Sequence, residues 1–135
     1  MLKVVLDTNV LISAIISDGK SRELLKKGIA NQYRIITSDL ILKELETVLC
    51  RPKFKTRQEE VNRIIHALNK TAHVVAVKTT IKAVKKDPQD DMIIETALDG
   101  EAQIIVTGDN HLLALERFQD IRIITIEEML TYLKK

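Results

Sequence analysis

Short apolar segments alternate along the chain with longer segments in which apolar residues recur at helical spacing. The short segments are rich in Ile and Val, as strands buried on both faces of a sheet are. Five such strands are expected, at residues 3–6, 34–37, 74–77, 103–106 and 121–124. Because buried strands that alternate with helices are typical of parallel sheets, this pattern predicts an α/β fold.

The segments between the strands carry signals for helix starts and ends. Ser38 and Asp39 are favoured N-cap residues, and Thr56 and Glu59 have the spacing of a capping box. Gly100 is suited to end a helix. The expected helices cover residues 9–16, 21–29, 39–49, 57–69, 89–98, 112–115 and 127–133. Right-handed crossovers would place them on both faces of a mostly parallel sheet, giving a three-layer α/β/α sandwich.

The composition supports one globular domain over residues 1–135. Ile, Leu and Val number 44, enough for a substantial core, and the single Cys50 excludes a disulfide framework. We expect Cys50 to be a small core residue. No apolar run approaches the length of a membrane span, and Asp7 interrupts the apolar stretch that a signal peptide would need. These features predict a cytoplasmic protein.

The charges are distributed unevenly, although the net charge is only +2. Residues 87–109 contain seven acidic residues and no Lys or Arg, while the other 112 residues hold 21 basic and 12 acidic side chains. This pattern suits a polyanionic substrate, or else reflects solvated helix surfaces. The candidate nucleic-acid contacts are Arg51, Lys53, Lys55, Arg57, Lys85 and Lys86. Phe54, inside the first basic group, is a candidate for stacking on a base.

Five carboxylates are expected near one edge of the sheet. Asp7 follows the first strand and Asp109 follows the fourth, while Glu44, Asp90 and Asp91 lie on the helices after the second and third strands. The carboxyl ends of parallel strands meet in one crevice, so these side chains would gather there. Taken singly, each residue has a simpler interpretation as a helix cap, a dipole partner or a solvated position.

Gathered carboxylates repel one another unless protons or cations neutralise them. Oxygen ligands favour hard cations such as Mg²⁺ or Mn²⁺ and argue against zinc, which prefers His and Cys. Two such ions could activate water and stabilise the leaving oxygen of a phosphodiester. The three His residues have no ligand spacing, although His111 could line the cleft.

Four motifs in order carry a family resemblance. They are residues 5–10 (VLDTNV), Ser38 with Glu44 and Leu45, residues 87–91 (DPQDD) and residues 106–109 (VTGD). From about Leu2 to Leu130 the chain resembles the PIN-domain nucleases, and more narrowly the VapC-like putative toxins of toxin–antitoxin pairs.

The resemblance implies a metal-dependent ribonuclease that uses Mg²⁺ or Mn²⁺. Asp7, Glu44, Asp91 and Asp109 match the acidic quartet of the family, with Asp90 as the alternative to Asp91 and Glu95 as a further candidate ligand. The residues expected to shape the site are Thr8, Asn9, Ser38 and Thr107. Many of these toxins carry an Arg before the third acid, where this chain has Lys85 and Lys86.

The resemblance also implies a homodimer and a small antitoxin protein as partners. Either some of the apolar residues on the first two helices form a self-complementary patch, or all of them belong to the core. They are Leu11, Ile12, Ile15, Ile16, Leu24, Leu25 and Ile29. The alternative functions are a PIN-fold RNA-binding or assembly module without activity and a housekeeping RNA-processing nuclease.

Overall fold

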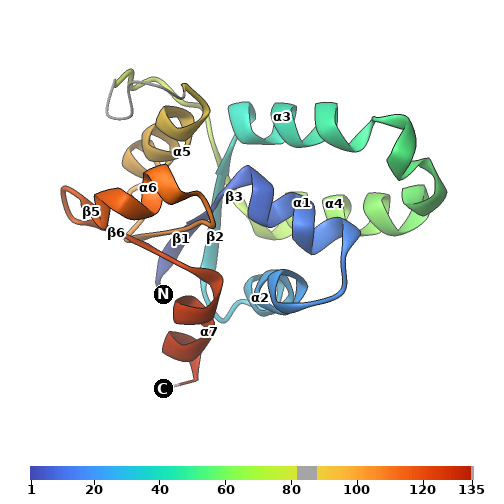
Figure 1. The fold of residues 1–135 in the computed structure, drawn as a ribbon, viewed down its shortest axis with the longest axis horizontal. Coiled ribbons are helices and arrows are strands. Elements are labelled where there is room, and N and C mark those ends of the chain that lie inside the picture. Colours follow the sequence, from blue (N-terminus) through green and yellow to red (C-terminus); the bar gives the residue numbers. More distant parts are fainter. Residues whose placement is uncertain (82–87, 135) are drawn as a thin grey trace.

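The computed structural model describes residues 1–81 and 88–134, and at residues 55–57, 88 and 89 it describes the backbone alone. In these residues the fold is built on a six-stranded sheet (Figure 1). The strand order is β3-β2-β1-β4-β6-β5, with β5 alone antiparallel to its neighbour. The strands are β1 (Lys3–Leu6), β2 (Arg34–Ser38), β3 (His73–Val75), β4 (Ile104–Val106), β5 (Arg117–Phe118) and β6 (Ile121–Ile124). The predicted parallel sheet is confirmed, and β5 is an additional strand.

Helices cover both faces of this sheet, as the predicted three-layer α/β/α sandwich requires. They are α1 (Thr8–Ile16), α2 (Lys20–Ile29), α3 (Asp39–Leu49), α4 (Gln58–Thr71), α5 (Pro88–Asp99), α6 (Asn110–Leu115) and α7 (Ile126–Leu133). A 3₁₀ segment, η1 (Pro52–Arg57), connects α3 to α4. Figure 1 shows α5 and α6 on one side of the sheet and α2 and α7 on the other, with α3 and α4 extending away from it.

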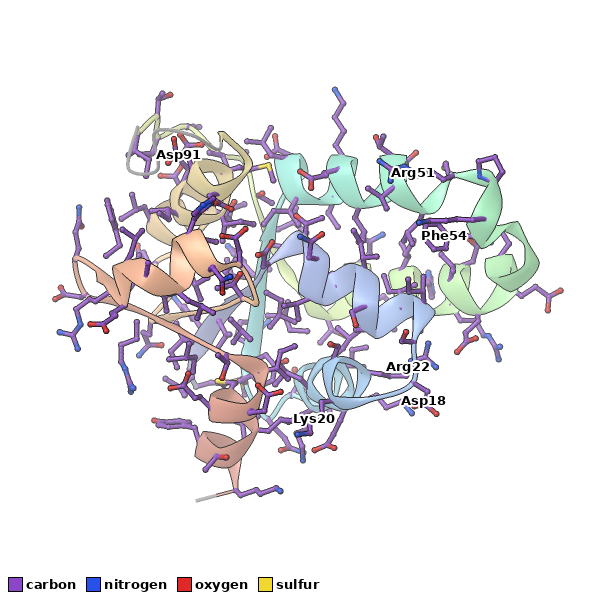
Figure 2. All side chains as sticks on the ribbon, in the orientation of Figure 1. Asp18, Lys20, Arg22, Arg51, Phe54 and Asp91 are labelled. Carbon is purple, nitrogen blue, oxygen red and sulfur yellow. The ribbon has the colours of Figure 1, made fainter. Side chains whose placement is uncertain are left out.

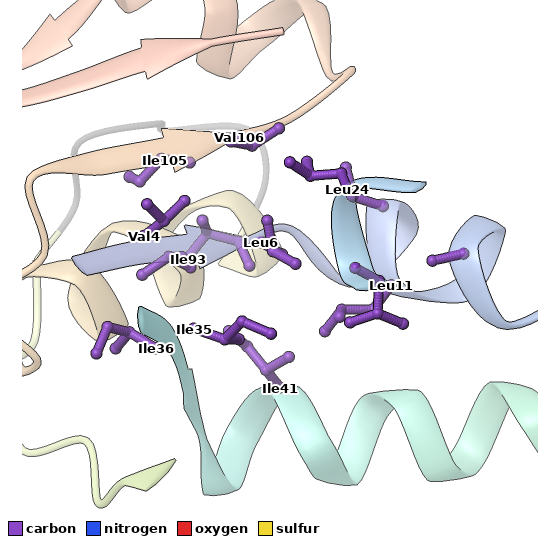
Figure 3. Close-up of a cluster of buried hydrophobic side chains, with 14 of the residues drawn as sticks. Val4, Leu6, Leu11, Leu24, Ile35, Ile36, Ile41, Ile93, Ile105 and Val106 are labelled. Atoms are coloured by element: carbon purple, nitrogen blue, oxygen red, sulfur yellow. The ribbon is translucent and has the colours of Figure 1, made fainter. Parts of the chain in front are cut away.

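The central strand β1 is buried on both faces from Val4 to Leu6, which explains the apolar sequence of these three residues. Val4, Val5 and Leu6 are each at most 1% exposed. Figure 3 shows Val4 and Leu6 among Ile93 of α5 and other branched aliphatic side chains. On the order of 2 kcal/mol per fully buried aliphatic side chain favours this core over the unfolded chain.

Close packing of α2 on the sheet depends on Gly28. A Cβ atom added there would lie 2.6 Å from the side chain of Ile35 in β2. Such a distance is far inside van der Waals contact, so any larger residue would push the helix from the strand. Gly28 thus lets α2 approach β2.

Most of the apolar residues of α1 and α2 lie in the core. Leu11, Ile15, Leu24 and Leu25 are at most 1% exposed. The remaining three (Ile12, Ile16 and Ile29) are partly buried against the same core. Four of the seven are therefore core residues, and the three partly buried ones are those that remain for the self-complementary patch, which stays a prediction.

Three local predictions need correction or stay open. Cys50 is exposed rather than part of the core, because it lies at the C-cap of α3, beyond the last buried residue of that helix. The third strand ends at Val75, two residues earlier than expected. The capping box of Thr56 and Glu59 stays a prediction, because the Thr56 side chain lies outside the described part of the structure.

Within the described residues, we find no helix that combines the length and apolar character needed to cross a membrane.

Candidate active site

Asp7 stands at the junction of β1 and α1, at the carboxyl edge of the sheet. Its backbone N–H donates to the carbonyl oxygen of Val106 at 3.0 Å, continuing the pairing of β1 with β4 by one residue. Its side chain caps α1 by accepting a hydrogen bond from the Asn9 N–H at 3.4 Å. The cap interpretation is therefore right, but it leaves the second carboxylate oxygen for other contacts.

That second oxygen is held by Thr107, which follows the neighbouring strand β4. The Thr107 hydroxyl donates to Asp7 Oδ2 at 2.6 Å and accepts from the Asp109 N–H at 3.0 Å. Thr107 is fully buried. Because Leu6 and Val106 are register partners in adjacent parallel strands, the residues after them are brought together at one edge. Thr107 thus links Asp7 to the loop that carries Asp109.

The environment of Asp7 opposes its negative charge. Burial raises the pKa of the Asp7 carboxyl above its usual value, and the nearby Asp109 carboxylate raises it further. Hydrogen bonds from Thr107 and from the backbone N–H groups of Asn9 and Thr8 act in the other direction. The effect of burial is larger than that of the hydrogen bonds, so the charged form of Asp7 remains disfavoured. A cation beside the carboxylate would offset this penalty.

Asp109 combines a helix cap with a place at the site. It begins α6, where its Oδ1 atom accepts hydrogen bonds from the N–H groups of His111 at 2.7 Å and Leu112 at 3.2 Å. The Thr107 hydroxyl, which contacts both the Asp7 carboxylate and the Asp109 N–H, brings the two residues to the same place. The sequence prediction that strands 1 and 4 bring these two residues together is consistent with this geometry.

Asp90 and His111 complete a group of potential ligands with Asp109. His111 Nδ1 lies 4.0 Å from Asp90 Oδ2 and 3.9 Å from Asp109 Oδ1. Among the described residues, these three side chains form a group that could hold a metal ion. Asp90 is buried, whereas the His111 side chain is 65% exposed.

The structure separates Asp90 from Asp91, which the sequence could not do. Consecutive helical residues point about 100° apart, and it is Asp90 that α5 turns toward Asp109 and His111. The favoured residue, Asp91, is also buried, and Figure 2 labels it at the start of α5, but it is not a member of this group. Which of the two residues faces Asp109 depends on the rotation of α5 about its axis, and this rotation is set by the packing of the helix.

Ser38 ends β2 and Glu44 lies on the helix α3 that follows, and β2 pairs with β1 on the side opposite to β4. Glu44 is half-buried on α3. Ser38 caps that helix by accepting from the Ile41 N–H at 3.2 Å, and the Thr96 hydroxyl of α5 donates to Ser38 Oγ at 2.8 Å. This buried hydroxyl contact ties the start of α3 to α5, so Ser38 has a structural role. Thr96 was missed because its only sequence signal is a hydroxyl on an apolar helix face.

The other candidate residues have varied positions. Thr8 is buried at the first position of α1, and Asn9 beside it is exposed. Glu95 is engaged elsewhere, because its Oε2 atom accepts from the Ile81 N–H at 2.9 Å. This contact favours a structural role for Glu95 over the suggested one in binding a second ion.

The basic segment after α3 lies away from the carboxylates. Arg51 and Lys53 are exposed, but α3 separates them from Ser38 by about 16 Å of helix, and Figure 2 shows Arg51 and Phe54 at this far end. Phe54 is buried, with Lys53 Nζ 5.0 Å from its ring centre, so its ring is not available for base stacking. The side chains of Lys55 and Arg57, and residues Lys85 and Lys86, lie outside the described parts of the structure.

Comparison with known proteins gives one family and one fold. The family model of the PIN domain matches residues 3–111. An uncharacterized protein of Methanocaldococcus jannaschii is 35% identical over 120 residues, covering 84% of this chain and 75% of that protein.

Two solved structures share the fold at low sequence identity. VapBC2 from Rickettsia felis, solved with a DNA fragment from its promoter, has a TM-score of 0.66 at 15% identity, covering 92% of this chain and 98% of the other. A protein from Pyrobaculum aerophilum has a TM-score of 0.63 at 15% identity, covering 98% of this chain and 90% of the other. The family match spans both β1 with Asp7 and the Thr107–His111 segment, and on that evidence this chain belongs to the PIN domain family.

Proposed function

We propose that this protein is a metal-dependent endoribonuclease that hydrolyses RNA phosphodiester bonds, and that it is the toxin of a toxin–antitoxin pair. The observation that carries this proposal is the joining of Asp7, Thr107 and Asp109 by hydrogen bonds and charge, with Asp90 beside Asp109. Carboxylates from three separate elements meet at the edge of the sheet where α/β proteins bind their ligands.

The residues present fit a divalent cation. The carboxylate oxygens of Asp7, Asp90 and Asp109 are ligands suited to Mg²⁺ or Mn²⁺, and Glu44 on α3 is the fourth candidate. In this proposal Asp90 takes the place that the sequence favoured for Asp91, because Asp90 faces Asp109. The raised pKa of Asp7 supports the assignment, since a bound cation would stabilise the charged carboxylate.

When bound, such a cation activates water and stabilises the charge that develops on the cleaved phosphodiester. The residues of the chain hold the ligand carboxylates in fixed orientations. Thr107 orients the Asp7 carboxylate and at the same time fixes the Asp109 backbone. The two Asp109 hydrogen bonds to the start of α6 limit the rotation of its carboxylate. This arrangement holds the ligands before substrate binds, which reduces the cost of organising the site.

The proposed substrate and partners have support from the family and from one structural neighbour. RNA is proposed as the substrate, with the basic surplus of the chain supplying phosphate contacts. VapBC2 of Rickettsia felis supports a small antitoxin as partner, and we propose a homodimer on the resemblance to VapC-like toxins. A module without activity is disfavoured, because the carboxylates at the site are present.

Cleavage of RNA by purified protein tests the chemistry. Asp7→Asn removes a ligand charge and should lower the rate by about 100-fold, while the exposed Asp18→Asn variant should cleave as the wild type does. Cleavage should stop in EDTA and return with Mg²⁺ or Mn²⁺. Undiminished cleavage in excess EDTA, or by Asp7→Asn, would show that the proposed metal centre is not responsible.

Expression in a host cell tests the biological role. Induction should arrest growth, and co-expression of the adjacent open reading frame should relieve the arrest. An active nuclease that leaves growth unaffected would be a housekeeping RNA-processing enzyme.

A further inference from the structure

His111 is the one nitrogen donor in the group of potential ligands that the described residues form. It lies two residues after Asp109. The other two His residues, His66 on α4 and His73 in β3, are exposed and belong to no such group among the described residues. The position of His111 therefore needs a separate explanation.

The backbone of His111 is anchored by a hydrogen bond, and its ring lies near two carboxylates. Its N–H donates to Asp109 Oδ1 at 2.7 Å, so the main chain is anchored to the carboxylate that the ring faces. Nδ1 is 3.9 Å from that oxygen and 4.0 Å from Asp90 Oδ2. Both distances are too long for hydrogen bonds.

These separations leave room for an ion between the ring and the carboxylates. With bonds of about 2.1 Å, adjacent ligand atoms on one octahedral ion lie about 3 Å apart and opposite ones about 4.2 Å apart. The two separations fall between these values, so a small rotation of the largely exposed His111 ring would bring Nδ1 to an adjacent ligand position. An alternative is a protonated ring that pairs with both carboxylates when no metal is bound. The two arrangements differ in whether a nitrogen atom bonds to the ion.

We propose that His111 Nδ1 is a direct ligand of the metal ion held by Asp90 and Asp109, and that it makes the centre select Mn²⁺ over Mg²⁺. Imidazole nitrogen binds transition-metal ions well, whereas Mg²⁺ prefers oxygen ligands. The inference rests on the proposed metal centre and adds the source of its selectivity. The sequence argument for an all-oxygen site would then be incomplete.

Metal binding measured without RNA tests this inference. Calorimetric titration with Mn²⁺ and with Mg²⁺ should show tighter Mn²⁺ binding by the wild type. His111→Ala should weaken Mn²⁺ binding by about tenfold and Mg²⁺ binding by much less. His66→Ala is the matched control and should leave both affinities unchanged. His111→Asn, which offers an oxygen instead of a nitrogen, should keep Mg²⁺ binding while losing the preference for Mn²⁺.

Pulsed electron paramagnetic resonance of the Mn²⁺-loaded protein gives a readout independent of activity. A ¹⁴N coupling from a bound imidazole should be present in the wild type and in His66→Ala, and absent in His111→Ala. Its absence from the Mn²⁺-loaded wild type, or its persistence in His111→Ala, would overturn the role of His111.

The failure of the metal centre itself has a different signature. If the wild type bound neither ion, or if Asp109→Asn bound Mn²⁺ as tightly as the wild type, the proposed function would fail together with this inference. If Asp109→Asn lost binding while His111→Ala kept both its Mn²⁺ affinity and its preference, only the inference would fail.

Discussion

At the scale of single residues, structure and charge conflict at Asp7. It caps α1 and accepts the Thr107 hydroxyl, yet burial and Asp109 disfavour its ionised form. Functional sites commonly keep such conflicts because the charged group is needed for ligand binding.

Asp7→Asn should therefore stabilise the metal-free protein at neutral pH. The raised pKa of Asp7 means that the folded state holds its proton to higher pH than the unfolded state does. Stability is thus lost as the pH rises from the ordinary Asp value through the folded pKa. The Asn amide oxygen can still accept the Thr107 hydrogen bond. Urea unfolding in EDTA should show a gain at pH 7 that shrinks toward pH 4; a loss at pH 7 would contradict the electrostatic argument.

Thr107→Val tests the link between Asp7 and Asp109. The substitution keeps the shape of the side chain but leaves the Asp7 carboxylate and the Asp109 N–H without the hydroxyl. Removing one partner of a buried hydrogen bond costs about 1–3 kcal/mol, and we expect unfolding measurements in denaturant to show a loss of that size. Thr107→Ser retains the hydroxyl and serves as the control. Equal stability of the Val and Ser variants would mean that the link contributes little.

At the scale of elements, Arg22 joins three helices away from the active site. From α2, it donates to the carbonyl oxygens of Ala14 and Ile15 at the end of α1 through Nε at 2.8 Å and Nη2 at 2.7 Å. Its Nη1 donates to Glu60 of α4 at 2.5 Å. One planar guanidinium thus satisfies the end of α1 and fixes its position relative to α4.

Arg22→Lys should cost more than Glu60→Gln. The Lys variant keeps the charge but cannot make three directed hydrogen bonds, and a loss of about 1–3 kcal/mol is expected. The Glu60 side chain is 42% exposed, so the ion pair itself contributes about 0–1 kcal/mol. Denaturant unfolding of both variants makes the comparison. A larger loss in Glu60→Gln would show that the ion pair outweighs the contacts with α1.

The whole molecule brings carboxylates together by the order of its strands. Because β1 and β4 are neighbours and parallel, Asp7 and Thr107 meet although they are 100 residues apart in sequence. α5 packs against the same central strands and adds Asp90 to that edge. Repulsion among these groups should make the metal-free fold less stable than the metal-bound one.

Binding of metal should raise the melting temperature of the protein. At a free concentration 100 times the dissociation constant, a ligand that binds only the folded state stabilises it by about 2.7 kcal/mol. Thermal melting with Mg²⁺ or Mn²⁺ against EDTA measures this shift, and Asp109→Asn should reduce it. A melting temperature that is the same with either metal as with EDTA would argue against a divalent-ion site.

Much of the fold could be predicted because its local patterns have direct physical causes. Val4 to Leu6 of β1 are all apolar because both faces of the strand are buried there, and the helices between such strands imply parallel pairing. The N-caps at Ser38 and Asp109 are local as well, since each side chain bonds to the backbone of its own helix. The prediction that the site lies at the carboxyl ends of the strands follows from the parallel pairing.

The tertiary structure alone decided what depends on contacts between distant segments. The position of β1 beside β4 determines which carboxylates meet, and the rotation of α5 on the sheet selects Asp90 over Asp91 for the group with His111. The two-residue strand β5 was too short to have a pattern, and burial of Phe54 depends on how η1 returns to α4. Sequence periodicity reports which face of an element is buried, whereas only packing fixes what that face meets.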